Sequence, residues 1–172
     1  GEYQYWESNT GIPEIAGTDL WYLVYFKKED YDEICSSYSD IVFDFSGLYV
    51  LMDTTKNRIY IGESSNVKTR IKQHIENTNS DLDEFDKISL IWDGRPTATS
   101  HLGNEGVRKS LEKECIELFK NNSQFEVVNH VTGAKKTNVY VESTSNRFTK
   151  ELAFLLGKFF GNKGCWNSSR YY

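Results

Sequence analysis

Two short runs of alternating apolar residues lie close together in the chain and constrain its fold most strongly. Residues 47–52 read GLYVLM, and residues 58–62 read RIYIG. A period of two is typical of β-strands, and the link between the runs contains Asp, Lys and Asn, which favour turns. We therefore predict a β-hairpin. Tyr49 and Tyr60, eleven residues apart, stand one on each of its strands.

The rest of the pattern predicts strands and helices around this hairpin. Runs of β-branched and aromatic residues predict strands at 19–26 and 87–92. A helix is expected over 64–77, with Val67, Ile71 and Ile75 as its buried stripe at i, i+4 and i+8. We also predict a short polar helix at 27–38, a loop at 94–103, helices at 104–121 and 146–160, and short apolar runs at 125–130 and 138–141. This order indicates an α/β (α+β) fold with a small, mainly antiparallel sheet flanked by helices.

Charge is distributed unevenly along the 172 residues, whose formal net charge is −5. Residues 1–45 hold ten acids and two bases, whereas residues 135–172 hold two acids and seven bases. The net charge argues weakly against a nucleic-acid partner, but the basic tail leaves room for phosphate contacts.

Cysteine content and hydropathy indicate the compartment. Cys35, Cys115 and Cys165 are too widely spaced for a zinc signature and too few for a disulfide framework. There is no apolar run of the length that spans a membrane, and no signal peptide is recognisable. We therefore expect a reduced, cytoplasmic protein that does not enter membranes.

Two helices carry the candidate chemistry. Asn66, Arg70 and His74 follow the hairpin at i, i+4 and i+8 and so share one stripe of their helix. On the helix at 104–121, Glu112 is the acid on an otherwise apolar strip with Ile116 and Phe119. An inward carboxylate needs a partner, which a metal ion or an arginine would supply.

These residues resemble the GIY-YIG nuclease superfamily. The matching features are the GLY and YIG motifs with their two tyrosines, Arg70 ten residues after the second tyrosine, His74, Glu112 in the local pattern LEKECI, and Asn129 in EVVNH. Asn121 and Asn122 are alternative, less favoured positions for the family's asparagine. Glu63 departs from the family pattern, because several members carry a lysine there. The YIGES and RIKQH segments are similar to a stand-alone bacterial and phage subset of these nucleases.

The resemblance implies a catalytic set of Tyr49, Tyr60, Arg70, His74, Glu112 and Asn129. Glu112 would bind one Mg²⁺ or Mn²⁺, which keeps several waters and stabilises developing charge. Tyr60 would orient or deprotonate the attacking water with help from Tyr49, and Arg70 would be the cation that makes this tyrosine acidic enough. Asn129 would hold the Glu112 end of the site.

The expected function is metal-dependent endonucleolytic cleavage of DNA, in restriction, phage conflict or homing. A GIY-YIG module that binds nucleic acid or protein without cutting, and an RNA-cleaving nuclease or toxin, stay open as alternatives.

The expected division of the chain is an N-terminal extension over 1–45, a GIY-YIG core over 46–132 and a basic extension over 133–172. Candidate nucleic-acid contacts are Asn66, Lys68, Lys150, Lys158 and Lys163. The oligomeric state is open, with a dimer as one arrangement for double-strand cleavage.

Overall fold

The computed structural model describes residues 4–8, 15–37, 43–76, 80–129 and 137–160. Within them, seven strands form one sheet in the order β1-β2-β3-β6-β4-β5-β7. The strands are β1 (Trp6–Ser8), β2 (Ile15–Gly17), β3 (Trp21–Lys27), β4 (Gly47–Asp53), β5 (Arg58–Ser64), β6 (Lys87–Trp92) and β7 (Glu126–Val127). All neighbours pair antiparallel except β5 and β7, which are parallel. The predicted α/β class and mainly antiparallel sheet are confirmed.

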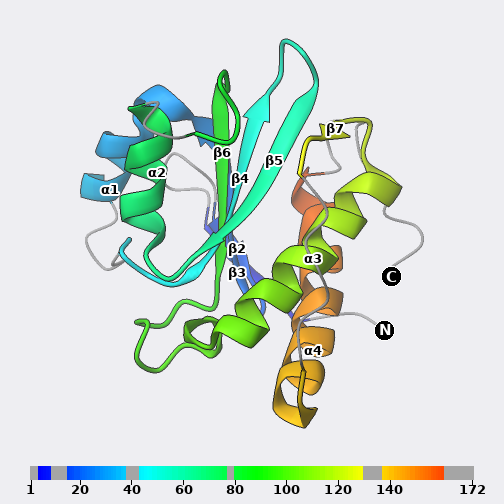
Figure 1. Ribbon diagram of the computed structural model, residues 1–172. Coiled ribbons are helices and arrows are strands. Elements are labelled where there is room, and N and C mark those ends of the chain that lie inside the picture. Colours follow the sequence, from blue (N-terminus) through cyan, green and yellow to red (C-terminus); the bar gives the residue numbers. More distant parts are fainter. Residues whose placement is uncertain (1–3, 9–14, 38–42, 77–79, 130–136, 161–172) are drawn as a thin grey trace.

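Helices cover both faces of this sheet. They are α1 (Tyr31–Ser37), α2 (Val67–Ile75), α3 (Glu105–Asn122) and α4 (Val139–Leu155), with short turns η1 (Lys28–Asp30), η2 (His101–Gly103) and the π-helical η3 (Leu156–Phe160). Figure 1 shows α1 and α2 on one side of the central strands and α3 and α4 on the other. Strand β4 lies between β6 and β5 under both layers, and each of its seven residues is buried.

The predicted hairpin is confirmed as β4 and β5, with Tyr49 paired directly across from Gly62. The carboxylate of Asp53 accepts hydrogen bonds from the backbone N–H groups of Thr55 (3.1 Å) and Lys56 (3.0 Å), which closes the turn. Asn57 completes it with a φ of 54°, a conformation that asparagine tolerates better than most residues. The turn chemistry therefore sets the register that brings the two tyrosines to the same face.

The N-terminal segment contributes more to the sheet than the sequence indicated. Besides the predicted strand, now β3, it supplies β1 and β2, and β3 pairs with β6. Three-residue strands carry too few alternations to be recognised from their pattern. Residues 15–27 thus extend the same sheet that holds the hairpin.

Two expectations about helices were wrong. The C-terminal helix begins at Val139 and not at residue 146, because the side chain of Asn138 caps it by accepting from the N–H of Val141 (2.9 Å). In α2, Ile75 is 37% exposed, and the buried position beside Ile71 belongs to His74, which is 2% exposed. A histidine with two hydrogen-bond partners can occupy a buried position that the apolar pattern alone assigns to isoleucine.

Helix α4 packs as its apolar stripe predicts, with Phe148, Leu152, Leu155 and Phe159 all buried. The buried carboxylate of Glu151 accepts from the backbone N–H groups of Asp19 (3.0 Å) and Leu20 (3.1 Å). This contact joins the C-terminal helix to the turn before β3. No helix of the described residues is long and apolar enough to cross a membrane.

Candidate active site

The two tyrosines face the same side of the hairpin. Their ring centroids lie 6.3 Å apart, and Tyr49 is fully buried while Tyr60 is partly exposed. The ring of Tyr49 lies across Gly62, where any added Cβ atom would overlap it. The glycine of the YIG run is therefore required by the tyrosine on the neighbouring strand.

Helix α2 starts directly after β5 and presents two side chains to these tyrosines. Asn66 caps the helix by accepting from the N–H of Thr69 (3.1 Å), and the N–H of Val67 donates to the carbonyl of Phe45 (2.9 Å). One turn and two turns later come Arg70 and His74. The cap and the buried Val67 thus fix where Arg70 and His74 lie.

His74 links helix α2 to Tyr49. Its Nε2 lies 3.1 Å from the Tyr49 hydroxyl, and its Nδ1 lies 2.8 Å from the hydroxyl of Ser80. Burial, followed by the charge of Arg70, lowers the pKa of His74 to about 4, although Asp81 acts in the opposite direction. The imidazole is therefore neutral at physiological pH.

Arg70 acts on Tyr49. Burial raises the pKa of Tyr49 to about 12, and the charge and hydrogen bond of Arg70 oppose that rise. Arg70 also donates to Asp81 (3.1 Å) and Gln73 (3.0 Å). The sequence predicts Arg70 as the cation that acts on Tyr60, and the structure shows that it also acts on Tyr49.

Tyr60 instead lies next to an acid. Burial raises its pKa well above the ordinary value, and Tyr49, Asp81 and Glu112 raise it further, Asp81 also through a side-chain hydrogen bond. In the free protein Tyr60 is a neutral hydroxyl. Asp81 thus interacts with both Tyr60 and Arg70.

Glu112 of α3 interacts with two residues of β5, Glu63 and Tyr60. Burial raises the pKa of its carboxyl to about 7, and the charge of Glu63 raises it as well, whereas Lys109, Arg108 and a backbone hydrogen bond from Glu63 act to lower it. On the same helix Leu111, Cys115 and Leu118 form the buried stripe, as predicted. A half-buried carboxylate with a second acid nearby is a site that a cation would stabilise.

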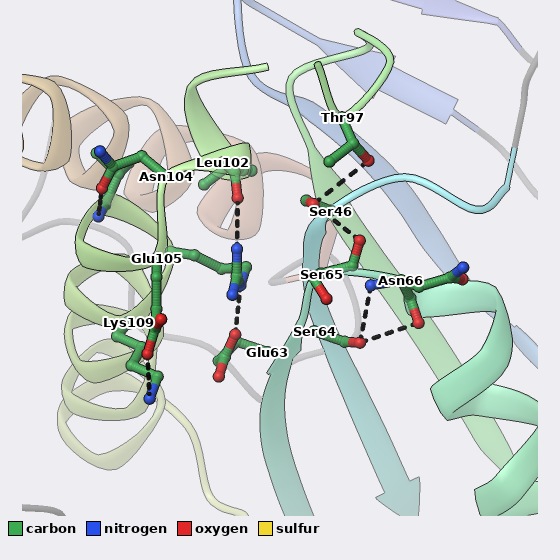
Figure 2. A network of polar contacts seen from close by, with 12 residues as sticks. Ser46, Glu63, Ser64, Ser65, Asn66, Thr97, Leu102, Asn104, Glu105 and Lys109 are labelled. Atoms are coloured by element: carbon green, nitrogen blue, oxygen red, sulfur yellow. Dashed lines mark hydrogen bonds and ion pairs between the residues drawn. The ribbon is translucent and has the colours of Figure 1, made fainter. Parts of the chain in front are cut away.

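Arg108, one turn before Glu112, fixes that second acid. Its side chain is 8% exposed, forms an ion pair with Glu63 and donates to the carbonyl of Leu102 (3.0 Å). Figure 2 shows Glu63 and Leu102 approaching the same guanidinium from opposite sides. Asn104 caps α3 by accepting from the N–H of Val107 (3.1 Å) and so sets the position of this turn.

The residues present fit one hard divalent ion. Among the described residues there is no group of three or more His, Cys, Asp or Glu side chains that could enclose a metal. Mg²⁺ keeps several waters and needs only one or two carboxylates, which Glu112, with Glu63 beside it, can supply. Burial and the charge of Glu63 raise the pKa of Glu112 despite the nearby Lys109 and Arg108, so a bound cation would favour its charged form.

Asn129 has a structural connection to the same strand. Its side-chain oxygen accepts from the N–H of Ile61 (2.9 Å), and its side-chain nitrogen donates to the carbonyl of Ile61 (2.6 Å). The amide thus continues the pairing of β7 with β5, one residue beyond Tyr60. Its described hydrogen bonds go to Ile61, so we assign it to holding β5 in place.

The candidate nucleic-acid contacts are dispersed. Asn66 uses its side-chain oxygen as the cap of α2. Burial raises the pKa of the Cys35 thiol on α1, and the charge of the nearby Lys68 opposes that rise. Lys150 is exposed on α4, and the ammonium of Lys158 lies 4.6 Å from the ring centroid of Tyr5. Lys163 falls outside the described residues.

Four residues near the site are not predicted from the linear pattern to belong to it. Ser80 and Asp81 belong to an acidic stretch without periodicity between α2 and β6, and Arg108 and Glu63 are recognised only once α3 lies against β5. One available signal was the spacing of Arg108 four residues before Glu112, which places both on one side of the helix.

Comparison with known proteins agrees with this geometry. Residues 45–126 match the family model described as the GIY-YIG catalytic domain. No match was found among curated proteins or among solved structures.

Proposed function

Because residues 45–126 form a GIY-YIG domain of the nuclease superfamily, we propose that this protein is a metal-dependent endonuclease that hydrolyses phosphodiester bonds in DNA. The observation that supports this most strongly is the convergence of Tyr49, Tyr60, Arg70 and His74 on one side of the hairpin. A protein that only binds nucleic acid has no need of a hydrogen-bonded histidine–tyrosine pair next to an arginine.

Arg70 is the residue that would bind the scissile phosphate. A guanidinium presents a planar fork that matches phosphate oxygens, and in the free protein this fork faces the carboxylate of Asp81 (3.1 Å). Substrate binding then exchanges one anion for another at Arg70. The Asp81 side chain is 46% exposed, so water would solvate it once the substrate phosphate had replaced it at Arg70.

The two tyrosines have different roles in the proposed reaction. Tyr60 is the more exposed of the two, so its neutral hydroxyl orients the attacking water. Tyr49 is the more easily deprotonated, because Arg70 lowers its pKa and Nε2 of His74 lies in hydrogen-bonding range. His74 is neutral, and its Nε2 holds the Tyr49 hydroxyl by a hydrogen bond (3.1 Å) without taking its proton, because the pKa of His74, about 4, lies far below that of Tyr49, about 12.

Glu112, with Glu63 beside it, would hold one Mg²⁺ or Mn²⁺. The ion would supply charge stabilisation to the phosphate and the leaving oxygen. Arg108 keeps Glu63 oriented through their ion pair. Because Glu112 is partly buried, fewer water molecules would compete with its carboxylate for the ion. DNA contacts outside the site would come from the basic tail, including Lys150, Lys158 and Lys163, in a restriction, phage-conflict or homing role.

The experiment that tests this function is cleavage of supercoiled plasmid and of a matched RNA with Mg²⁺, Mn²⁺ or EDTA. We expect nicked or linear DNA with either metal ion and intact plasmid with EDTA. Glu112→Gln should remove cleavage, whereas Glu117→Gln, an exposed acid on the same helix, should not. Binding of DNA without any cleavage would contradict the proposal, and cleavage of RNA alone would replace DNA as the substrate.

A further inference from the structure

We propose that Ser80 is a positioning residue of this site. Its hydroxyl oxygen fixes His74 as the neutral tautomer that carries its proton on Nδ1, so that Nε2 accepts a hydrogen bond from Tyr49. The catalytic consequence rests on the proposed nuclease function, whereas the tautomer itself does not.

The other hydrogen bonds of Ser80 show which group donates in its contact with His74. The Ser80 hydroxyl lies 2.8 Å from the carbonyl of Leu82 and 2.8 Å from Nδ1 of His74, and the N–H of Leu82 points to it at 3.4 Å. A carbonyl can only accept, and a hydroxyl has one proton to donate. The Ser80 proton therefore goes to Leu82, and Nδ1 of His74 must be the donor.

The protonation state of the other ring nitrogen, Nε2, follows from the neutral charge of the ring. A neutral imidazole has one N–H, so Nε2 is an acceptor and the Tyr49 hydroxyl donates to it across 3.1 Å. Burial and the adjacent Arg70 keep the ring neutral. The Tyr49 oxygen is then left to accept from the guanidinium of Arg70, with which it is hydrogen-bonded.

These contacts form one directed chain. Arg70 donates to Tyr49, Tyr49 to His74, His74 to Ser80, and Ser80 to the carbonyl of Leu82. Hydrogen bonds aligned in this way strengthen one another in a buried setting. His74 is 2% exposed, so water does not compete for its nitrogens.

The groups that face His74 come from four parts of the fold. Tyr49 on β4 and Tyr60 on β5 lie with ring centroids 5.2 and 6.2 Å from it, Arg70 lies on its own helix, and Phe85 and Asp81 come from the connection to β6. Among the hydrogen bonds described for this cluster, the Ser80 hydroxyl is the acceptor for Nδ1. Without it, the tautomer protonated on Nε2 becomes accessible, and Tyr49 loses its acceptor.

The test is ¹⁵N NMR of protein labelled in histidine, with the His74 signals assigned in a variant that lacks His101 and His130. At pH 7 we expect a protonated Nδ1 and an unprotonated Nε2. Ser80→Ala should shift the population toward the Nε2-protonated tautomer and lower kcat on plasmid by at least about tenfold, with little change in KM. Ser80→Thr, which retains the hydroxyl, should restore both.

A matched control is Ser36→Ala on α1, whose exposed hydroxyl bonds only to the carbonyl of its own helix at Asp32 in the contacts described. It should leave the tautomer and cleavage unchanged. A wild-type His74 protonated on Nε2 would overturn the proposal, even if Ser80→Ala fails to fold. So would an unchanged tautomer with wild-type cleavage in Ser80→Ala. A confirmed tautomer in a protein that cuts no nucleic acid would contradict the nuclease function and leave the assignment of Ser80 to His74 intact.

Discussion

At the scale of single residues, Glu112 is an acid whose charged form is disfavoured by burial in the folded protein. Its carboxyl has a pKa of about 7 in the folded protein, against an ordinary value of 4.5. The folded state therefore binds the proton more tightly than the unfolded state. The contribution of Glu112 to the free energy of unfolding is therefore fully present below pH 4.5, where the carboxyl is protonated, and is lost as the pH rises through 7.

Replacing Glu112 with Gln should therefore stabilise the metal-free protein above pH 7. We expect a gain in the free energy of unfolding of roughly 1–3 kcal/mol at pH 8, which vanishes near pH 4. Thermal melts in EDTA at both pH values measure this gain, and Mg²⁺ should then raise the melting temperature of the wild type only. Glu117→Gln serves as the control, and equal melting of wild type and Glu112→Gln at pH 8 would contradict the assigned burial cost.

Two further substitutions test the residues that handle substrate. Tyr60→Phe removes one hydroxyl and should fold normally, yet lose about a hundredfold or more of the cleavage rate because the attacking water is no longer oriented. Arg70→Lys keeps the charge but not the planar fork, and should also fail. Single-turnover cleavage at saturating DNA, with circular dichroism as the folding check, measures both. Wild-type turnover in Tyr60→Phe would exclude this tyrosine from the chemistry.

At the scale of the elements, the β4–β5 hairpin determines where the site lies. A side chain at Gly62 would overlap the Tyr49 ring, so Gly62→Ala should displace this ring from His74. We expect a loss of about 1–3 kcal/mol in stability together with the loss of most cleavage. Thr55→Ala, in the exposed turn of the same hairpin, should leave activity unchanged. Urea unfolding and plasmid cleavage of the two variants, measured together, check this.

The connection between α2 and β6 acts on the site through Asp81, which pairs with Arg70 across 3.1 Å. Asp81→Asn removes an anion that competes with the substrate phosphate. DNA binding at low salt should therefore become several-fold tighter, by an amount that shrinks as salt screens the charges. Fluorescence anisotropy with the cleavage-deficient Glu112→Gln background measures this affinity. Weaker binding would show that Asp81 supports Arg70 rather than competing for it.

Strong periodicity explains which elements could be predicted from the sequence. The hairpin, β6 and α3 have clear patterns and caps, and they were predicted to within a few residues. Helix α4 was predicted too short because its first turn contains β-branched residues, which resemble a strand until Asn138 is recognised as a cap. The roles of Ser80, Asp81 and Arg108 depend on contacts between segments far apart in the chain, which no local pattern encodes.

At the scale of the whole molecule, the chain separates an acidic N-terminal part from a basic C-terminal part. Residues 1–45 hold ten acids, and residues 135–172 hold seven bases. The two parts are nevertheless joined, because Glu151 of α4 binds the backbone at Asp19 and Leu20. Within the described residues, α4 packs on α3 and exposes Lys150, and Arg147 pairs with Asp19 across 3.5 Å.

The basic tail is expected to contribute affinity rather than chemistry. Replacing Lys150, Lys158 and Lys163 with Gln should weaken duplex binding at low salt and flatten its salt dependence. Each phosphate contact that is lost should lower the slope of log K against log salt by about 0.9. The chemical step at saturating DNA should change little, because neither Lys150 nor Lys158 lies among the side chains that contact Tyr49, Tyr60 or Glu112 in the described contacts.

A control of equal charge separates a specific tail contact from a general loss of positive charge. Lys27, Lys56 and Lys120 are all exposed and lie on β3, in the β4–β5 turn and at the end of α3. Changing these three to Gln alters the net charge by the same amount, so long-range attraction to DNA falls equally in both variants. If the tail binds phosphates directly, its variant should show the larger fall in slope between low and moderate salt. Equal slopes in the two variants would instead make the tail a structural cap on α3 and the sheet.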